Sequence, residues 1–282
     1  KDPSKVNFYT NNDGQLVLTT GDVNINKGGR GRGAKWLDLD LDGDLDLILI
    51  NEASLAKSKP QHFFYKNLGN GTFDYTAVNG VQDVEQSRAI VTDINNDHID
   101  DLIFYSPLSI WQGNGDFTFK EVTHQLPHNV TRLKGVMAMT DIDIDNDGDL
   151  DVIVNNINDN ASIYKNNTNS LNYVRLKLDG PPSNKQGLNA KVWLYTNERY
   201  QFKEFQVSRG FQSSVDPSIH FGLKPDEKIN RVEIQWSNGM TQVENNIKAS
   251  TINTIQYKAQ KTTLSWKKQT PIFKDLSAKT SL

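Results

Sequence analysis

Short stretches in which apolar and polar residues alternate run along the chain, and turns rich in Gly, Asn and Asp separate them. Residues 64–78, FYKNLGNGTFDYTAV, and residues 110–123, IWQGNGDFTFKEVT, each hold an apolar run, a Gly/Asn turn and a second alternating run. This pattern predicts a β-hairpin on each occasion. Residues 8–20 show the same pattern, and residues 162–176 show a degraded version of it.

Three acidic segments stand between these hairpins and repeat one another in register. Each has Asp at the first place, Asp or Asn at the third, and Asp at the fifth and ninth. The openings lie 55 and 50 residues apart. The four places hold Asp38, Asp40, Asp42 and Asp46 in the first loop, Asp93, Asn95, Asp97 and Asp101 in the second, and Asp143, Asp145, Asp147 and Asp151 in the third.

Each period contains an acidic loop, a short apolar strand, a connection and a hairpin, which together make about four short strands. Repeats of this size that consist only of strands are typical of β-propeller blades. We therefore predict an all-β fold in which residues 1–168 form partial β-propeller blades, about three and a half in number.

The spacing of the acidic residues predicts a calcium site in each loop. Calcium takes about six to eight oxygen ligands, and alternating Asp residues in a tight loop turn every second side chain inward. Places one, three, five and nine then converge on one ion, and the backbone carbonyl of place seven completes the set. We predict about three Ca²⁺ ions, one per acidic loop, each a structural clamp. The predicted metal ligands are Asp38, Asp40, Asp42, Asp44 and Asp46, then Asp93, Asn95, Asp97, Ile99 and Asp101, then Asp143, Asp145, Asp147, Asp149 and Asp151.

Other interpretations of the loops carry less weight. An EF-hand needs a bidentate Glu at place twelve, and these loops have Leu49, Phe104 and Val154 there. Asp, Asn and Gly also form turns without any metal, but three copies in register argue against turn formation alone. Magnesium demands tighter octahedral geometry. The second loop is the weakest predicted site, because Asn95 is neutral and His98 stands where the other loops have Gly.

The second half of the chain has a different sequence pattern. Residues 169–260 lack acidic loops and contain alternating stretches such as AKVWLYT and RVEIQWS, joined by turns such as PPSNKQG and SNGM. This pattern predicts a compact antiparallel β-sandwich or barrel. Residues 261–282 leave that domain, and we expect a linker and the start of a further module there.

Composition narrows the function classes. The chain has no cysteine, which excludes disulfides and thiolate metal sites. Its pI of about 6.0 argues against nucleic acid as a partner, and the GGRGRG run at residues 28–33 is too short to change that. No apolar run approaches the roughly 18 residues that a helical membrane span needs, so we expect no direct membrane span.

The acidic loops and the hairpins before them resemble the FG-GAP/VCBS repeat of integrin-α-like propellers. The resemblance rests on the DxDxDG-plus-Asp loop and the NxGNGTF hairpin, and it covers residues 1 to about 168. The second half is similar to the UnbV/ASPIC domain, through GFQSSVD at 210–216, HFGL at 220–223 and WSNG at 236–239. The GLNAKV entry at 187–192 departs from the family pattern at Leu188 and Asn189.

The combined resemblance, to cartilage-acidic-protein-like chains and cell-surface proteins of Bacteroidetes, implies a location and a role. It implies an extracellular or cell-surface protein, outer-membrane associated if bacterial, and a fragment of a larger multi-propeller chain. The expected function is a calcium-binding protein-interaction module that binds a protein partner at the cell surface and docks on an outer-membrane complex.

Two further functions need weighing. Ser213, Ser214, Asp216 and His220 lie close in sequence, but they lack a GxSxG motif and an oxyanion motif, so we predict no enzyme. The alternative is a carbohydrate-binding, lectin-like propeller, because exposed tryptophans can stack on sugars; the same tryptophans can instead pack between blades or inside the β domain. The tryptophans are Trp36, Trp111, Trp193, Trp236 and Trp266.

Overall fold

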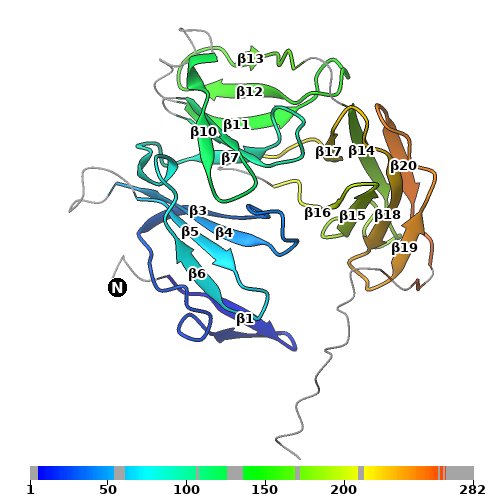
Figure 1. The fold of residues 1–282 in the computed structure, drawn as a ribbon, viewed down its shortest axis with the longest axis horizontal. Helices are drawn as coiled ribbons and strands as arrows, with labels where there is room; N and C mark the ends of the chain where they lie inside the picture. The colour runs from blue at the N-terminus through cyan, green and yellow to red at the C-terminus, as the bar shows by residue number, and fades with distance from the viewer. Residues whose placement is uncertain are drawn as a thin grey trace, which may run out of the picture.

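Strands make up nearly all of the regular structure in this computed structural model, which confirms the predicted all-β class (Figure 1). It describes residues 6–53, 61–105, 108–125, 136–168, 172–208, 213–259, 261–262 and 264. Within those ranges the helical segments are short 3₁₀ turns, η1 (Val81–Asp83) and η2 (Thr123–Gln125). None of the helices in this part of the chain is long and apolar enough to cross a membrane.

The first half forms a row of small antiparallel sheets. Strand order within each sheet follows the chain, as in propeller blades. Hairpin β1–β2 forms a two-stranded sheet of its own before the first complete blade. The strands are β1 (Tyr9–Asn12) and β2 (Gln15–Leu18); β3 (Arg30–Leu37), β4 (Asp46–Glu52), β5 (Phe63–Asn67) and β6 (Phe73–Thr76) in blade one; β7 (Ala89–Thr92), β8 (Asp101–Phe104), β9 (Ser109–Gly113) and β10 (Phe119–Glu121) in blade two; and β11 (Val136–Ile142), β12 (Asp151–Asn156) and β13 (Ser162–Tyr164) in blade three.

The second strand of each blade has an apolar run after its first Asp, and in β4 this run is buried on both faces between neighbouring sheets. In β4, Ile48 and Ile50 pack toward the core shared with blade two, while Leu47 and Leu49 pack in a separate core with Tyr65. Alternate residues of a strand point to opposite faces, so a continuous apolar run is what a doubly covered strand requires. This packing holds the acidic loop at the start of each second strand in a fixed place.

The second half is a β-sandwich of two sheets. One has the order β17–β14–β20 and the other the order β16–β15–β18–β19. No sheet of the described residues closes into a barrel, and the predicted antiparallel pattern has one exception, because β14 and β20 pair in parallel. Val174, Leu194 and Val232 lie in the core between the sheets. The strands are β14 (Asn172–Asp179), β15 (Lys191–Thr196), β16 (Tyr200–Glu204), β17 (Ile219–Leu223), β18 (Ile229–Gln235), β19 (Thr241–Glu244) and β20 (Ile252–Gln256).

The degraded hairpin predicted over residues 162–176 was wrong in its second half. Residues 172–176 belong to β14, which pairs with β17 and β20 of the sandwich rather than with β13. The reason is burial, because Val174 and Leu176 lie in the sandwich core. The further module expected at the end of the chain lies mostly outside the described residues, since 265–282 are not among them.

Candidate metal centres

Each acidic loop joins the first strand of a blade to the second. Loop one lies between β3 and β4, loop two between β7 and β8, and loop three between β11 and β12. All three have the same unusual backbone, with positive φ at places four and six. Positive φ is uncommon for non-glycine residues, although Asn adopts it more readily than most. The φ values are 60° at Leu41, 57° at Asn96 and 60° at Asn146 for place four, and 91° at Gly43, 76° at His98 and 98° at Gly148 for place six.

The carboxylate at place one closes the loop on itself. Asp38 accepts hydrogen bonds from the backbone N–H groups of Asp42, at 3.1 Å, and Gly43, at 3.0 Å. The corresponding pair at Asp93 is 3.0 and 2.8 Å. Asp143 accepts the N–H of Gly148 at 3.2 Å. Place one therefore fixes the turn as well as offering oxygens to its interior.

The carboxylate at place nine ties the loop to the blade. In every loop it is buried, and it accepts one backbone N–H from place two and one from the end of the third strand or just beyond it. At Asp46 the donors are Leu39 and Asn67, both at 2.8 Å. Asp101 and Asp151 repeat the arrangement. The sequence predicts a metal ligand at this place, and the structure adds a separate structural role there.

Two loops bring three carboxylates together. Oxygens of Asp38, Asp40 and Asp42 lie within 4.8 Å of one another, and so do oxygens of Asp143, Asp145 and Asp151. No such group forms at loop two within the described ranges. There the Asn95 amide donates to Asp97 at 2.8 Å. That loop two is the weakest site stays a prediction.

Places five and seven are linked in the same way in all three loops. The N–H of place seven donates to the place-five carboxylate, at 3.0 Å in loop one, 2.8 Å in loop two and 3.2 Å in loop three. This local turn fixes the residue at place seven, whose carbonyl was predicted as a ligand. The residues at place seven are Asp44, Ile99 and Asp149.

Several buried loop oxygens have no hydrogen-bond donor from the protein. They are Oδ1 of Asp40, Oδ1 of Asp143 and Oδ1 of Asp149. Burying a carboxylate oxygen without a partner is costly, and a bound cation removes that cost. The donor set consists of oxygens only, which suits a hard divalent ion such as calcium. The residues present thus fit the predicted ion.

Burial makes these carboxyl groups hard to ionise in the absence of a cation. Burial, together with the neighbouring charges of Asp42, Asp46 and Asp40, raises the pKa of Asp38 to about 7. Burial also raises the pKa of Asp93 to about 7 and of Asp101 to about 8. A divalent ion would favour the charged carboxylates and displace the protons.

Lysine side chains that the metal prediction missed lie against the loops. The Lys66 ammonium group contacts Asp40 and lies 3.4 Å from Asp42, and Lys165 contacts Asp145. The hydrogen bond with Asp40 raises the pKa of Lys66. The repeated Tyr-Lys-Asn of residues 65–67 and 164–166 is the sequence signal that could have revealed these lysines.

Most of the described tryptophans are packed. Trp236 and Trp193 are buried in the sandwich domain, and Trp193 stacks on Phe202. Trp36 is 46% exposed but also contacts Phe8 and Phe73. Packing between blades and inside the β domain therefore accounts for these rings better than sugar binding does. Trp266 lies outside the described residues.

The polar residues considered for a catalytic triad lie where the sandwich domain meets the blades. Asp216 pairs with Arg175, and His220 Nε2 lies 2.7 Å from Asn96 Oδ1 in loop two. The Ser214 carbonyl accepts a hydrogen bond from Thr140 of β11. All these interactions join parts of the fold.

Comparison with protein families confirms the architecture that the sequence motifs indicate. Residues 93–154 match the family model of the FG-GAP-like repeat, and residues 180–262 match that of ASPIC and UnbV. The first match contains acidic loops two and three, and the second covers most of the sandwich domain.

Comparison with individual proteins adds little. No curated protein matches the chain. A solved structure with similarity is a lectin from Agrocybe aegerita, described as recognising non-reducing terminal N-acetylglucosamine. The TM-score is 0.34 and the identity 19%, and the match covers 58% of this chain and 47% of that one. The matched region thus spans about half of the lectin's length.

Proposed function

From a chain that joins an FG-GAP-like repeat to an ASPIC and UnbV domain, we propose a calcium-binding, non-catalytic interaction module of an extracellular or cell-surface protein. Its partner is a protein at the cell surface. Calcium occupies the acidic loops, one ion in each, and stabilises the conformation of each loop.

One observation carries the proposal. Three loops far apart in sequence share one backbone conformation, and two of them also gather three carboxylates within 4.8 Å. Buried oxygens of Asp40 and Asp143 are left without protein donors. Turn formation alone explains the backbone but leaves those oxygens unexplained, whereas a bound cation explains both.

The exposure of the loops supports an extracellular setting. Asp42, Asp145 and Asp147 are exposed, so an ion in these loops keeps contact with solvent. Extracellular modules typically bind calcium with Kd of about 10⁻⁴–10⁻³ M, where the ambient calcium concentration makes weak sites sufficient. FG-GAP-like repeats are typical of extracellular proteins, which supports the same location.

The non-catalytic assignment rests on how the charged groups are used. The buried carboxylates Asp46, Asp101 and Asp151 accept backbone hydrogen bonds. Asp216 pairs with Arg175 inside the sandwich, and His220 contacts Asn96 across the junction between blades and sandwich. These contacts give the groups structural roles, which supports the non-catalytic assignment.

Capture of a partner tests the interaction role. The chain is immobilised and exposed to the surface fraction of its source cells in calcium buffer, and bound material is eluted with EGTA. We expect a specific protein in the eluate. The matched control carries Asp40→Asn and Asp145→Asn, which weaken two loops, and should retain much less of it. Elution of glycan without protein would favour the carbohydrate-binding alternative, and equal capture by both chains would contradict a role for calcium.

A further inference from the structure

We propose that the sandwich domain is a cap docked on the three acidic loops, and that calcium in the loops locks the cap to the blades. This inference rests on the calcium binding proposed above and adds an interface to it. In Figure 1 the turns between the first and second strands of the blades point toward the sandwich. Three strands of the sandwich, β14, β16 and β17, supply the residues that contact them.

Loop three is held by Arg175 of β14. Its side chain is buried, and Nη1 donates to Asp143 Oδ2 at 2.9 Å while Nη2 donates to Asp216 Oδ2 at 2.8 Å. The other oxygen of Asp143 has no protein donor. An ion in loop three and the arginine of the cap would thus use opposite oxygens of one carboxylate, and Arg175 is a positioning residue for a metal ligand.

Tyrosines of the cap pack directly on the place-six glycines of loops one and three. A Cβ atom on Gly43 would overlap the hydroxyl of Tyr200, and one on Gly148 would overlap the ring of Tyr173. These glycines therefore have two reasons to lack a side chain. One is the positive φ of the turn, and the other is the close approach of the cap.

Loop two shows the reciprocal arrangement. Its place six is His98, and the glycine is on the cap instead, at Gly222 of β17. A Cβ on Gly222 would overlap the carboxylate of Asp93 and lie 2.7 Å from the Asn96 carbonyl oxygen. Beside it, His220 Nε2 lies 2.7 Å from Asn96 Oδ1. The match of small and large residues at all three loops indicates a specific interface.

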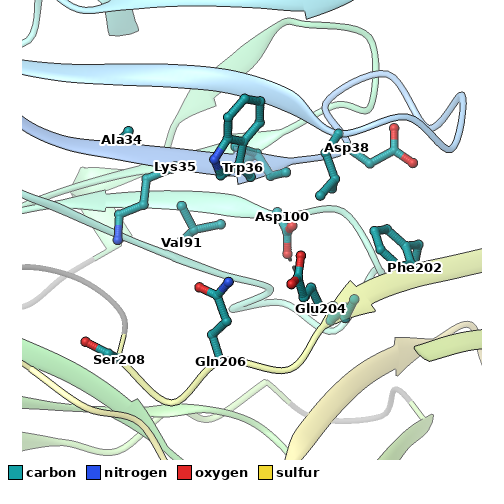
Figure 2. A pocket seen from close by; sticks show the side chains of 13 residues that line it. Ala34, Lys35, Trp36, Asp38, Val91, Asp100, Phe202, Glu204, Gln206 and Ser208 are labelled. Atoms are coloured by element: carbon teal, nitrogen blue, oxygen red, sulfur yellow. Dashed lines mark ion pairs between the residues drawn. The ribbon is translucent and has the colours of Figure 1, made fainter. Parts of the chain in front are cut away.

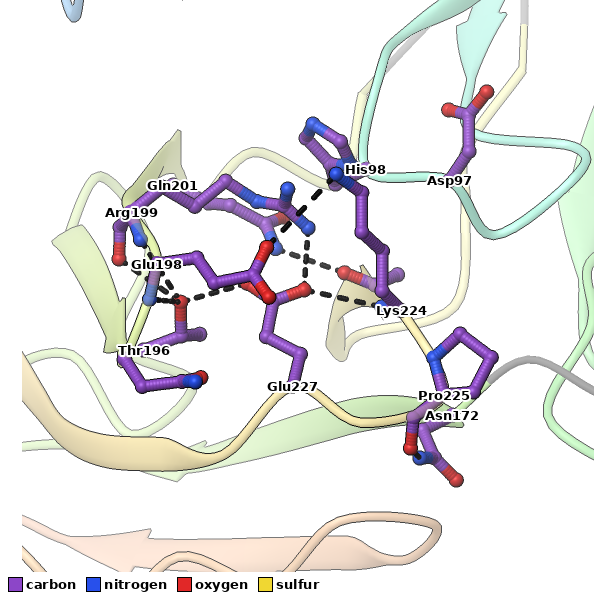
Figure 3. Close-up of polar contacts among 12 residues, drawn as sticks. Asp97, His98, Asn172, Thr196, Glu198, Arg199, Gln201, Lys224, Pro225 and Glu227 are labelled. Carbon is purple, nitrogen blue, oxygen red and sulfur yellow. Dashed lines mark hydrogen bonds and ion pairs between the residues drawn. The ribbon is translucent and has the colours of Figure 1, made fainter.

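A rigid polar network of the cap stands next to His98. Figure 3 shows the Lys224 side chain beside His98, with Glu227 at the centre of the surrounding contacts. Glu227 is buried, pairs with Arg199, and accepts hydrogen bonds from Thr196 at 2.6 Å and from the Lys224 N–H at 3.0 Å. This network fixes the turns of the cap that face loop two.

The junction is not close-packed throughout. A cavity of about 180 Å³ lies between β3 and β16, with polar and apolar side chains in its lining, and it reaches Asp38 of loop one (Figure 2). At its edge Lys203 and Asp100 form an ion pair at 3.5 Å. The close contacts of the junction are those of Tyr200, Tyr173 and Gly222 with the loops, and the docking depends on the shape of the loops there.

Thermodynamic linkage turns this geometry into a prediction. If the ion favours the loop conformation that the cap recognises, the docked cap must favour ion binding by the same factor. Blocking the cap at one loop should then weaken calcium binding at the loops that the block does not touch. Gly222→Ala blocks docking at loop two, where the added methyl group overlaps Asp93 and Asn96, so calcium binding at loops one and three is the informative measurement. Gly21→Ala is the matched control, since a Cβ there meets nothing within 4 Å.

The test measures the distance between the two parts of the full chain. Because the chain has no cysteine, Glu121→Cys on β10 and Lys177→Cys on β14 place two spin labels cleanly on exposed residues. Pulsed electron resonance should give a narrow distance distribution in calcium and a broad one in EGTA. Gly222→Ala should keep a broad distance distribution in saturating calcium and bind calcium at loops one and three about five-fold or more weakly in calorimetry, and Gly21→Ala should behave like the parent chain.

Two results would overturn the inference, and they are distinguishable. If calorimetry shows calcium binding but the parent distribution is the same in calcium and in EGTA, the ions do not lock the cap, and the proposed function stands. If calorimetry shows no calcium binding, the proposed function falls and the lock falls with it.

Discussion

At the residue scale, two aspartates of one loop have different surroundings and different expected roles. Asp145 at place three is exposed and contacts Lys165. Asp151 at place nine is buried and accepts backbone N–H groups from Ile144 and Asn166, each at 2.8 Å. An exposed ion pair contributes little to stability, whereas a buried carboxylate that satisfies backbone donors contributes much more.

Melting of two variants with and without calcium separates these roles. Asp145→Asn should lower the melting temperature of the calcium-saturated protein. In EGTA it should change the free energy of unfolding by less than about 1 kcal/mol. Asp151→Asn should destabilise both forms, by about 1.5–3 kcal/mol, because hydrogen bonds to a charged group are lost. Equal effects of Asp145→Asn in calcium and in EGTA would contradict its role as a ligand.

Lys165 competes with a cation for loop three. Blade two has Gln112 at the position that corresponds to Lys165. Lys165→Gln therefore introduces a residue that already occupies this position in another blade. Removing one positive charge a few ångströms from the site should tighten calcium binding by roughly five-fold. Calorimetric titration measures the change. Unchanged calcium affinity would show that the lysine does not compete with the ion. Weaker calcium affinity would show that the lysine supports the loop.

The sequence predicted the loops well and their surroundings poorly. The places of Asp38, Asp93 and Asp143 follow from a strict repeat, and the shared backbone confirms that the loops are equivalent. The contacts of Arg175 and Tyr200 could not be predicted in this way. Each lies in an ordinary alternating strand, and only the folded arrangement brings it to a loop.

At the element scale, β5 is tied to blade two by a buried histidine just before it. His62 Nδ1 accepts the Asn51 N–H at 3.1 Å, Nε2 faces the Val84 carbonyl oxygen at 3.2 Å, and the ring stacks on Phe104 of β8. Burial lowers the pKa of His62 to about 4. The folded blade thus holds this imidazole in its neutral form.

The histidine should make blade stability depend on pH. Between the ordinary histidine pKa of about 6.5 and the folded value of about 4, the unfolded chain binds the proton more readily. The stabilisation is therefore full above pH 6.5 and is lost as the pH falls to 4, by roughly 3 kcal/mol. Urea unfolding measures the free energy of unfolding of the parent chain and of His62→Gln at each pH. The difference between the two free energies should fall as the pH is lowered from 6.5 to 4. A difference independent of pH would contradict it.

The strand pattern predicted the elements better than their partners. The two-sided apolar run of β4 and the Gly/Asn hairpin turns placed strands correctly in blades one and two. Residues 172–176 were misassigned because an alternating pattern predicts a strand but does not indicate which sheet the strand joins. Their partners β17 and β20 lie far along the chain, so only the core between the two sheets decides the pairing.

At the scale of the whole molecule, the acidic loops have two functions. They join the strands within each blade, and they form the platform on which the sandwich domain docks. The acidic pattern indicates the first function, because 15 of the 34 acidic residues lie in three short segments of a chain of formal net charge −3. The second function arises from pairs of small and large residues such as Gly43 and Tyr200, which lie more than a hundred residues apart, and no local pattern reveals it.

The measurement that tests the central claim most directly is a calorimetric calcium titration of the full chain. The control carries Asp38→Asn, Asp93→Asn and Asp143→Asn, which remove one charge from each loop, and magnesium is titrated in parallel. We predict saturable binding of about three calcium ions per chain, with loop two the weakest, at a Kd no higher than about 10⁻³ M. The control should bind much more weakly, and magnesium should bind less tightly than calcium. Absence of saturable binding, or equal binding by the control, would contradict the assignment of the acidic loops as calcium sites.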